Sequence, residues 1–507
     1  MSALCCALLS LASVAASPTG ADETSAIADA VRRAGDGGSV VLGAGRHFIR
    51  GVVPVDGLRD FTLRGETGAV VVVHASAAGT LNECNNAFVV RDCERFAMEN
   101  LVFTTDAPTS AAGRLVAADS KAGTFDVRLD AGSRASGGEH VACIDSCAES
   151  GMPDRLLEMS GRLRQERGEA GRTVVSVEGV PFAVVAPDTI RFTAPGGSAF
   201  DFSRLRPGHR FALRYSLWGG GLVTFLKTRG AAVRDVTVER CNAMAVVVGE
   251  GCADFSFKRL SVRPAPGAAF SSNADGIHVV GLSGTLSLDE CLFERLGDDA
   301  LNVHARAFVV KGGRLPSQLE ASPVVVVYDP KTFQVKARGT AATLCLSDGD
   351  VVADARHFPS VRIRDTTCRA MRARGFLVQT GDVLIERCTF RDIGRPAILC
   401  APDIERWFEL GPCSNVEIRD SVFDGCDAAT PADAAAAIAF RASHGVGGKS
   451  YPPGVHSGVR IAGNRFARTR GAAVSLESTS DVELHGNDFD TPNPIRLMRC
   501  SGVRQTK

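Results

Sequence analysis

Aromatic residues are scarce in this sequence, and neither sign of charge is in excess. Its 507 residues include 2 Trp and 3 Tyr, and 57 Lys and Arg are matched by 57 Asp and Glu, so the formal net charge is zero. A protein that binds nucleic acid or a polyanion needs a basic surface, so nucleic acid is not expected as a partner. No apolar run beyond the leading segment reaches membrane-spanning length, so no membrane span is expected.

Cysteine pairs with metal-binding spacing are also missing. The chain has 16 Cys but no Cys-x-x-Cys motif, and Cys143 and Cys147 have no nearby His or Cys pair to complete a zinc site. We therefore expect no metal and no cofactor. Glycine, by contrast, is abundant at 53 residues, which suits many short strands joined by tight turns.

A short phrase with apolar residues at alternate positions recurs along the chain. Such alternation is typical of a short strand with one buried face. A second apolar alternation follows most copies of the phrase, which indicates two short strands per repeat. The copies span residues 236–241, 286–293, 383–390, 416–423, 459–466 and 482–489.

This pattern predicts an all-β fold, a right-handed parallel β-helix. Helical repeats do not fit the pattern, and a propeller would need four strands per period. Equivalent residues on successive rungs of a β-helix stack about 4.8 Å apart. The alignment therefore places Cys241, Cys291 and Cys388 in one interior column with Asn464 and Asn487.

The ends and interruptions of the repeat define the expected domains. Ile27, Ala30, Val31 and Ala34 have the spacing of a short amphipathic helix, which would cap a first rung at 40–49. Two stretches have strand patterning without the phrase, and each predicts an inserted small β-barrel-like domain that walls a binding site. The expected divisions are a signal peptide at 1–17, the cap and first rungs at 18–106, a first insertion at 107–216, rungs with catalytic aspartates at 217–305, a second insertion at 306–357, and C-terminal rungs at 358–507.

Three aspartates fall on adjacent rungs between the two insertions. Aligning the second strands makes Asp275 equivalent to Asp299, and Asp298 directly precedes Asp299. Stacked like charges raise the pKa of at least one carboxyl, which keeps it protonated near neutral pH. Glycoside hydrolysis needs one protonated and one ionised carboxyl, and a third acid favours a water held by a pair, with inversion. Turn formation and a calcium site are the alternative interpretations.

Further polar residues are expected on the same face. His278 and Asn302 alternate with inward-facing apolar residues, and Arg374 continues the column of Asp275 and Asp299. An aromatic ring in the excursion after a rung can stack on a sugar. For each residue, a surface or ladder role is the alternative to ligand contact. The candidates for substrate contact are Asn273, His278, Asn302, His304, Arg374, Gln379, Trp407 and Glu409.

Together these phrases resemble glycoside hydrolase family 110, the exo-acting α-1,3-galactosidases. The resemblance rests on Asn273-Ala-Asp-Gly-Ile-His, on Gly297-Asp-Asp-Ala-Leu-Asn-Val-His, on Arg374-Gly-Phe-Leu-Val-Gln-Thr-Gly and on Trp407-Phe-Glu-Leu-Gly-Pro, and it covers most of the chain. It implies the removal, with inversion, of terminal α-1,3-linked galactose, as in blood group B and linear α-galactosyl glycans. It also implies that Asp298 is the general acid, and that Asp275 and Asp299 position and deprotonate water.

Other proteins built on a β-helix supply the alternative functions. Polygalacturonases carry similar aspartate phrases, but their Gly-His-Gly and Arg-Ile-Lys elements are absent here, and zero net charge suits a neutral sugar. A polysaccharide lyase or uronate epimerase is a second enzymatic alternative. A non-catalytic glycan-binding β-helix is the non-enzymatic one.

The first residues resemble a secretory signal, with a short apolar core followed by small residues near Ala16, although no Lys or Arg precedes the core. We therefore expect a periplasmic or secreted protein. The sequence leaves the oligomeric state open, with a homodimer as one form.

Overall fold

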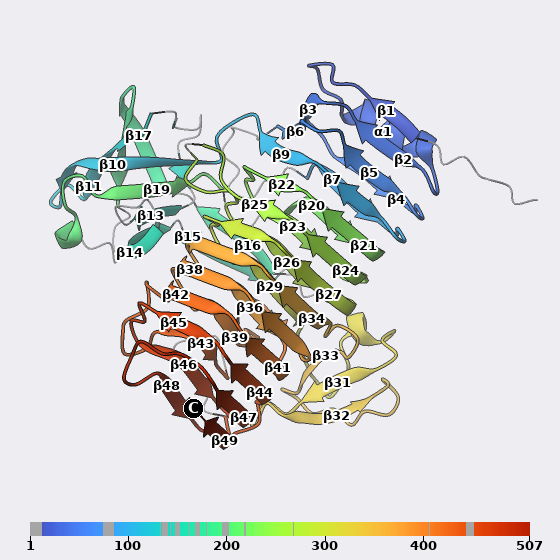
Figure 1. Cartoon of the computed structure of the whole chain (residues 1–507), viewed down its shortest axis with the longest axis vertical. Coiled ribbons are helices and arrows are strands. Elements are labelled where there is room, and N and C mark those ends of the chain that lie inside the picture. Colours follow the sequence, from blue (N-terminus) through green and yellow to red (C-terminus); the bar gives the residue numbers. More distant parts are fainter. Residues whose placement is uncertain are drawn as a thin grey trace, which may run out of the picture.

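The computed structural model is a long coil of β-strands with two smaller sheets attached to its side (Figure 1). Among the described residues, strands predominate and α1 (Thr24–Ala34) lies at the N-terminal end. Within that part of the chain, the helices are too short or too polar to cross a lipid bilayer. The structure describes residues 13–74, 86–131, 133, 140–141, 143–147, 153–160, 162–167, 173–178, 180–194, 202–216, 220–266, 268–404, 406–442 and 451–506.

Most turns of the coil contribute one strand to each of three parallel sheets in the described part of the chain, so the predicted parallel β-helix is confirmed. Sheet 1 contains β1 (Ser13–Ala16), β2 (Ser39–Leu42), β5 (Thr62–Gly65), β8 (Ala97–Glu99), β21 (Arg229–Arg234), β24 (Ala253–Lys258), β27 (Ser283–Asp289), β34 (Ser360–Arg364), β37 (Val383–Glu386), β41 (Ser414–Arg419), β44 (His456–Ala462), β47 (Thr479–His485) and β49 (Ser501–Thr506). Sheet 2 contains β3 (Gly45–Ile49), β6 (Ala69–Val73), β9 (Val102–Thr105), β22 (Thr237–Val238), β25 (Ser261–Val262), β28 (Leu292–Glu294), β35 (Thr367–Met371), β38 (Thr389–Ile393), β42 (Val422–Cys426) and β45 (Arg465–Ala467).

Sheet 3 carries the second apolar alternation seen in the sequence. It contains β4 (Val53–Asp56), β7 (Phe88–Arg91), β20 (Gly221–Leu226), β23 (Met244–Val248), β26 (Ile277–Val280), β29 (Leu301–Arg306), β36 (Phe376–Gln379), β39 (Ile398–Cys400), β43 (Ala436–Phe440), β46 (Ala472–Glu477) and β48 (Ile495–Met498), with β40 (Glu409–Leu410) antiparallel to β29. The sequence predicted two strands per repeat, whereas the structure has three. Several strands of sheet 2 are only two or three residues long, too short to show an alternation of their own.

The core of the coil is filled by the alternate apolar residues of each strand. Val361 and Ile363 of β34, for example, are fully buried, while Arg362 between them is not. Phenylalanines on successive turns stack on one another, with ring centroids 4.9 Å apart for Phe390 and Phe423 and again for Phe423 and Phe466. This stacking follows from the in-register parallel pairing of the strands.

One corner of the coil carries a ladder of small polar side chains. Of the column predicted from the sequence, Cys291, Cys388, Asn464 and Asn487 belong to this ladder, but Cys241 does not. The amide of Cys291 donates to Thr366 Oγ1 (3.3 Å), and the amide of Asn464 donates to Asn487 Oδ1 (3.0 Å). Cys388 lies between them in the same ladder, with its amide donating to Ser421 Oγ (3.0 Å). Cys241 does not belong to this column, because the phrase at 236–241 lies on sheet 2 and not on sheet 1.

The N-terminal end of the coil is closed by α1. Its apolar side chains lie against the first turn, and Ile27, Ala30, Val31 and Ala34 are buried as the sequence predicted. Gly35 ends the helix with a φ of 63°, a conformation that favours glycine. The described part of the predicted signal peptide, β1, pairs with β2 at the edge of sheet 1, and residues 1–12 of that segment lie outside the described residues.

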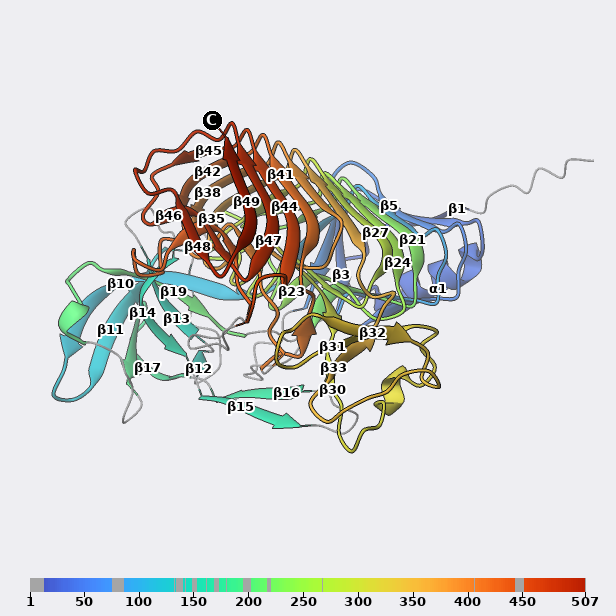
Figure 2. The ribbon, with the colours of Figure 1, turned by 90° about the horizontal axis from the view of Figure 1, so that it is seen from below.

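Two antiparallel sheets interrupt the coil and lie at its side (Figure 2). The division into domains stays a prediction, but these strands lie in the stretches that lack the repeated phrase. The first sheet contains β12 (His140–Val141), β17 (Val180–Ala186), β18 (Thr189–Thr193), β11 (Thr124–Leu129), β10 (Ser110–Asp119), β19 (Arg210–Arg214), β13 (Cys143–Cys147) and β14 (Pro153–Ser160), with the hairpin β15 (Arg162–Arg167) and β16 (Thr173–Glu178) and the 3₁₀ turn η2 (Phe202–Arg204) nearby in sequence. The second contains β30 (Phe308–Val309), β33 (Val351–Asp354), β31 (Val325–Tyr328) and β32 (Val335–Gly339), with η3 (Ser317–Leu319).

Candidate active site

The three aspartates meet at the start of β26 and β29 on sheet 3. The strands pair with Ile277 opposite Leu301, which places Asp275 opposite Asp299 on adjacent rungs, as the sequence predicted. Asp275, Asp298 and Asp299 each offer an oxygen within 4.8 Å of the others. The amide of Asp299 donates to Asp275 Oδ1 (3.0 Å), so the two turns are joined directly.

Arg374 and His278 face this cluster. Arg374 continues the column just before β36 and donates from Nε to Asp299 Oδ1 (2.8 Å), and its Nη2 lies 3.9 Å from Asp298 Oδ1. His278 donates from Nδ1 to Asp275 Oδ2 (2.7 Å). A calcium ion among the aspartates would be repelled by Arg374, so this arrangement favours acid–base chemistry over the calcium alternative.

Burial and mutual repulsion change the acidity of the cluster. Burial raises the pKa of Asp275, with Asp298 adding to the effect and His278 opposing it. Burial raises the pKa of Asp299 well above its ordinary value, despite Arg374. The cluster therefore retains a proton to a higher pH than isolated carboxylates would, and this proton is a property of the group as a whole. Asp298 is the most accessible member, with 22% of its side chain exposed against 6% for Asp275 and 1% for Asp299.

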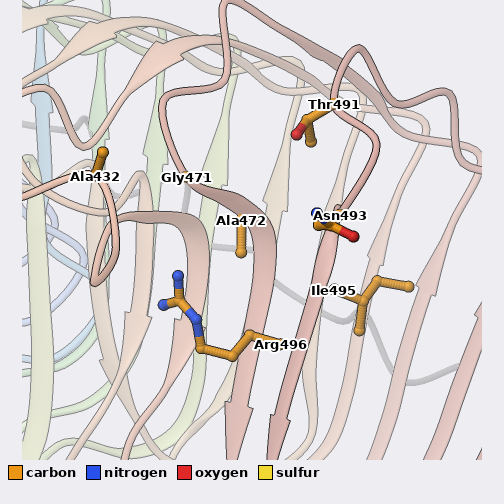
Figure 3. Close-up of a pocket in the computed structure, with 7 residues that line it drawn as sticks. All are labelled: Ala432, Gly471, Ala472, Thr491, Asn493, Ile495 and Arg496. Carbon is orange, nitrogen blue, oxygen red and sulfur yellow. The ribbon is translucent and has the colours of Figure 1, made fainter.

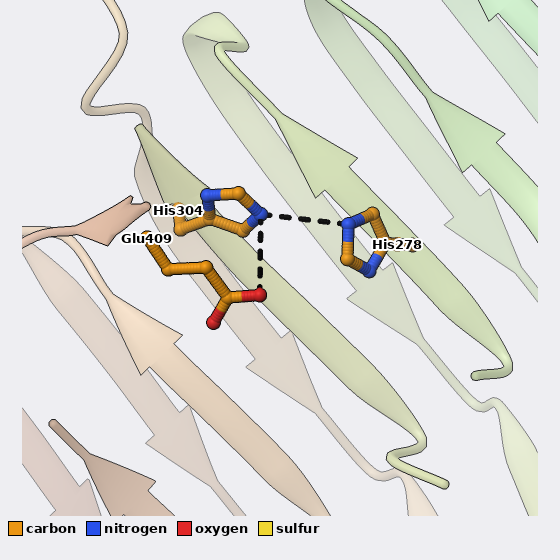
Figure 4. Close-up of side chains that lie close together, drawn as sticks. All are labelled: His278, His304 and Glu409. Atoms are coloured by element: carbon orange, nitrogen blue, oxygen red, sulfur yellow. Dashed lines mark hydrogen bonds and ion pairs between the residues drawn. The ribbon is translucent and has the colours of Figure 1, made fainter. Parts of the chain in front are cut away.

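Beside the aspartates, His278, His304 and Glu409 form a second cluster (Figure 4). The Nε2 atoms of the two histidines lie 3.4 Å apart, and His304 Nε2 lies 3.7 Å from Glu409 Oε1. Burial alone would lower the pKa of His278, but the carboxylates of Asp275, Glu409 and Asp298 outweigh it and raise that pKa. Burial lowers the pKa of His304, whose Nδ1 donates to the Ala305 carbonyl (3.0 Å).

The Ala305 carbonyl can only accept, so a neutral His304 presents Nε2 as an acceptor, and His278 Nε2 can donate to it. The same three side chains are also a donor set that a transition metal accepts, but a hydrogen bond between the two rings already accounts for their contact.

Two amides fix the carboxylate of Glu409. Asn302 Nδ2 donates to Glu409 Oε1 (3.1 Å), and Gln379 Nε2 donates to Oε2 (2.8 Å). Burial opposes ionisation, but the neighbouring histidines and these hydrogen bonds lower the pKa of Glu409. The carbonyl oxygens of Asn302 and Gln379 are buried and have no hydrogen-bond partner among the described residues, so each can accept from a ligand hydroxyl.

The remaining predicted residues occupy different positions. Trp407 is half-buried in the loop before β40, with the Arg406 guanidinium carbon 5.2 Å from its ring centre. Asn273 is fully buried and donates to the Thr109 carbonyl (2.8 Å) and to Ser216 Oγ (3.1 Å), which flank the first inserted sheet. These hydrogen bonds connect Asn273 to both ends of the first insertion, and its contact with substrate stays a prediction.

Sequence reasoning missed the groups behind the aspartates. Arg214, Arg372 and Asp145 are buried together there, and both arginines donate to the Gly297 carbonyl at 3.1 Å. Asp145 and Arg214 lie in the first insertion, which does not follow the repeat, so no periodic signal brings them to the site.

A separate hollow of about 420 Å³ lies farther along sheet 3 (Figure 3). Ala472 in its wall occupies the rung position of Asp299 three strands beyond Arg374. The hollow has no carboxylate in its lining, so the chemistry that the aspartates can perform is not available there. Its lining residues are Ala432, Gly471, Ala472, Thr491, Asn493, Ile495 and Arg496.

Several known proteins are similar to this chain in sequence or in structure. No family model matches the chain. Two solved structures match nearly the whole chain in backbone structure. The family 28 exopolygalacturonase of Yersinia enterocolitica has a TM-score of 0.47 and 12% identity, and the match covers 95% of this chain and 75% of that one. The polygalacturonase of Erwinia carotovora has a TM-score of 0.48 and 10% identity, and the match covers 98% of this chain and 96% of that one.

Curated sequences named α-1,3-galactosidase are also similar to this chain. The protein named α-1,3-galactosidase A from Akkermansia muciniphila is 28% identical over 283 residues, which is 48% of this chain and 45% of that protein. A protein named α-1,3-galactosidase A from Bacteroides fragilis is 24% identical over 340 residues, which is 60% of this chain and 55% of that protein. The chain thus spans about half the length of the curated relatives it matches, and the resemblance drawn from its motifs is confirmed as a similarity to proteins named α-1,3-galactosidase.

Proposed function

We propose that this protein is an exo-acting glycoside hydrolase that removes terminal α-1,3-linked galactose from glycans such as the blood group B antigen. The cluster of Asp275, Asp298 and Asp299 carries the proposal, because three carboxylates within 4.8 Å of one another supply both a proton and a base. The similarity to proteins named α-1,3-galactosidase supports the choice of sugar and linkage.

In this proposal Asp298 is the general acid. It is the exposed member of the cluster, so it can reach the glycosidic oxygen and donate the proton that the cluster as a whole retains. Asp275 and Asp299 are buried and fixed by hydrogen bonds, which suits a pair that holds and deprotonates water.

The neighbouring polar residues would bind the galactose hydroxyls. The unpaired carbonyl oxygens of Asn302 and Gln379 and the ionised Glu409 are acceptors, and Arg374 is a donor. A zero net charge agrees with a neutral sugar. The proposed substrate-binding residues are Asn273, His278, Asn302, His304, Arg374, Gln379, Trp407 and Glu409, and Asn273 also connects to the first insertion.

An inverting mechanism requires a particular spacing of the carboxyl groups. Inverting enzymes commonly have acid and base carboxyls about 6.5–9.5 Å apart, with water between them. The oxygens here lie within 4.8 Å, nearer to the about 5–5.5 Å of retaining enzymes, so inversion requires that the Asp275 and Asp299 pair itself holds the water. The anomer released is therefore the sharpest test of the reaction course.

The experiment is digestion of galactosyl-α-1,3-galactose and of a blood group B oligosaccharide, followed by proton NMR from the first minutes. We expect free galactose that appears first as the β-anomer. A first product in the α form would contradict inversion while leaving the hydrolase assignment intact. An unsaturated product absorbing in the ultraviolet would indicate a lyase, and binding without product release would indicate a glycan-binding protein.

The setting of this activity is also a proposal. A signal-like N-terminus and a glycan substrate both agree with a secreted or periplasmic enzyme, built as one solenoid with two inserted domains. Fractionation of cells that express the full chain would test its location, and cytoplasmic retention would contradict it.

A further inference from the structure

Two buried arginines hold the backbone directly ahead of the aspartates. The Gly297 carbonyl accepts hydrogen bonds from Nη1 of Arg214 and Nη1 of Arg372, each 3.1 Å long. Nη1 of Arg214 also donates to the Asn273 carbonyl (3.0 Å). Asn273 and Gly297 lie in the turns that lead into Asp275 and Asp298, so one guanidinium joins the two turns.

Asp145 joins the two arginines to each other. Its Oδ1 accepts from Arg372 Nε (2.7 Å), and its Oδ2 lies 3.4 Å from Arg214 Nη2. Asp145 lies on β13 and Arg214 on β19 of the first inserted sheet, whereas Arg372 follows β35 of the coil. All three side chains are buried, with exposures of 0%, 2% and 7% respectively.

The surroundings leave this arrangement little freedom. A Cβ added at Gly297 would lie 2.3 Å from the Asn273 carbonyl oxygen and 3.0 Å from Arg214 Nη1, so the turns and the guanidinium are in close contact. Two guanidinium groups that donate to one carbonyl repel each other. The carboxylate of Asp145 offsets this repulsion, and a buried charge that loses its partner forces the surrounding structure to move.

We propose that Asp145 is a positioning residue that, through Arg214 and Arg372, fixes the separation of Asp275 and Asp298. The first insertion thereby takes part in the catalytic geometry without touching the substrate. This inference rests on the proposed function for its kinetic readout, but the order of the two turns can be measured without any substrate.

The test is the variant Asp145→Asn, which keeps the shape of the side chain and removes its charge. A displacement of about 1 Å at a catalytic group can cost about 10²-fold in rate, so we expect a fall in kcat of that order with a much smaller change in KM. Hydrogen–deuterium exchange should increase in peptides that cover 272–276 and 296–300.

Asp126→Asn is the matched control. Asp126 and Arg191 form a two-point ion pair (2.7 and 2.8 Å) in the same inserted sheet, and this pair makes its contact across β11 and β18 and not at the catalytic turns. We expect this variant to leave kcat and the exchange of the two turns unchanged. An equal loss of kcat in both variants would mean that any loosening of the sheet suffices, and would overturn the proposal.

Wild-type kcat and unchanged exchange in Asp145→Asn would also overturn it. Arg372→Lys serves if Asp145→Asn fails to fold, because a lysine keeps the positive charge but cannot reproduce the fork between Asp145 and Gly297. It should show the same loss of kcat and the same increase in exchange, and wild-type values would contradict the proposal. If the wild-type protein cleaves no α-galactoside, the proposed function fails, and the exchange measurement on Asp145→Asn and Asp126→Asn alone decides the positioning role.

Discussion

Asp298 differs from its two neighbours at the scale of single residues, because it alone among the three has more than a tenth of its side chain exposed. Replacing Asp298 with Asn should lower kcat on galactosyl-α-1,3-galactose by about 10²–10⁴-fold, the range expected for loss of a general acid. An aryl α-galactoside with a good leaving group needs less protonation and should lose less activity. Equal losses on both substrates, measured by steady-state kinetics, would argue against Asp298 as the acid.

The same substitution should change stability in a pH-dependent way. Burial raises the pKa of Asp275 and of Asp299 above the ordinary 3.8, and repulsion among the three carboxyls that share the retained proton adds to this effect. A carboxyl whose pKa is higher in the folded than in the unfolded state lowers the free energy of unfolding as pH rises. This loss begins near the unfolded-state pKa and is complete above the folded-state pKa. Asp298→Asn should therefore stabilise the fold by about 1 kcal/mol at pH 7, with no gain below pH 3.8. Urea unfolding at both pH values measures this, and an equal gain at low pH would contradict the electrostatic origin.

Glu409 controls the protonation of the histidine pair. Its carboxylate helps to raise the pKa of His278, so the neutral variant Glu409→Gln should lower that pKa. His278 would then lose its second proton at a lower pH than in the wild type. An NMR titration of the histidine ring protons measures the shift, and a pKa that stays the same or rises would show that Glu409 does not act on His278.

At the scale of elements, periodicity determined what the sequence could predict. The column of Asp275, Asp299 and Arg374 was predictable, because alternating apolar residues fix the register of β26, β29 and β36. Cys241 was misplaced because short strands on two different sheets share the same apolar phrase. Asp145 was not predictable, since its contact with Arg372 joins an aperiodic insertion to the coil.

The corner ladder is an element whose contribution can be measured. Asn464 accepts from the Ser421 amide and donates to the Ile418 carbonyl, so Asn464→Ala leaves buried backbone groups without partners. We expect a loss of about 2–4 kcal/mol in the free energy of unfolding, with kcat per folded molecule unchanged. Asn487→Ala, at a more exposed position on the next turn, should cost less. An equal loss of unfolding free energy in the two variants would show that burial does not determine how much each residue of the ladder contributes to stability.

At the scale of the whole molecule, the two inserted sheets support the site from different directions. The first reaches the turns before the aspartates through Asn273 and Asp145. The second packs against the segment that carries Glu409, because Phe333 and Tyr328 share a buried cluster with Leu410 and Tyr451. A solenoid alone would present the aspartate column without these supports.

Phe333 tests the contribution of the second sheet. Its ring lies 5.5 Å from that of Tyr328 and 5.6 Å from that of Tyr451, so Phe333→Ala should cost about 3–5 kcal/mol in stability. Because Leu410 in the same cluster adjoins Glu409, we also expect KM for the galactoside to rise about tenfold, with little change in kcat. Leu319→Ala is the control, since Leu319 is buried in the other apolar cluster of that sheet. It should lower stability without changing KM, and a KM that rises equally in both variants would show that Glu409 responds to the stability of the whole sheet and not to the contact at Phe333.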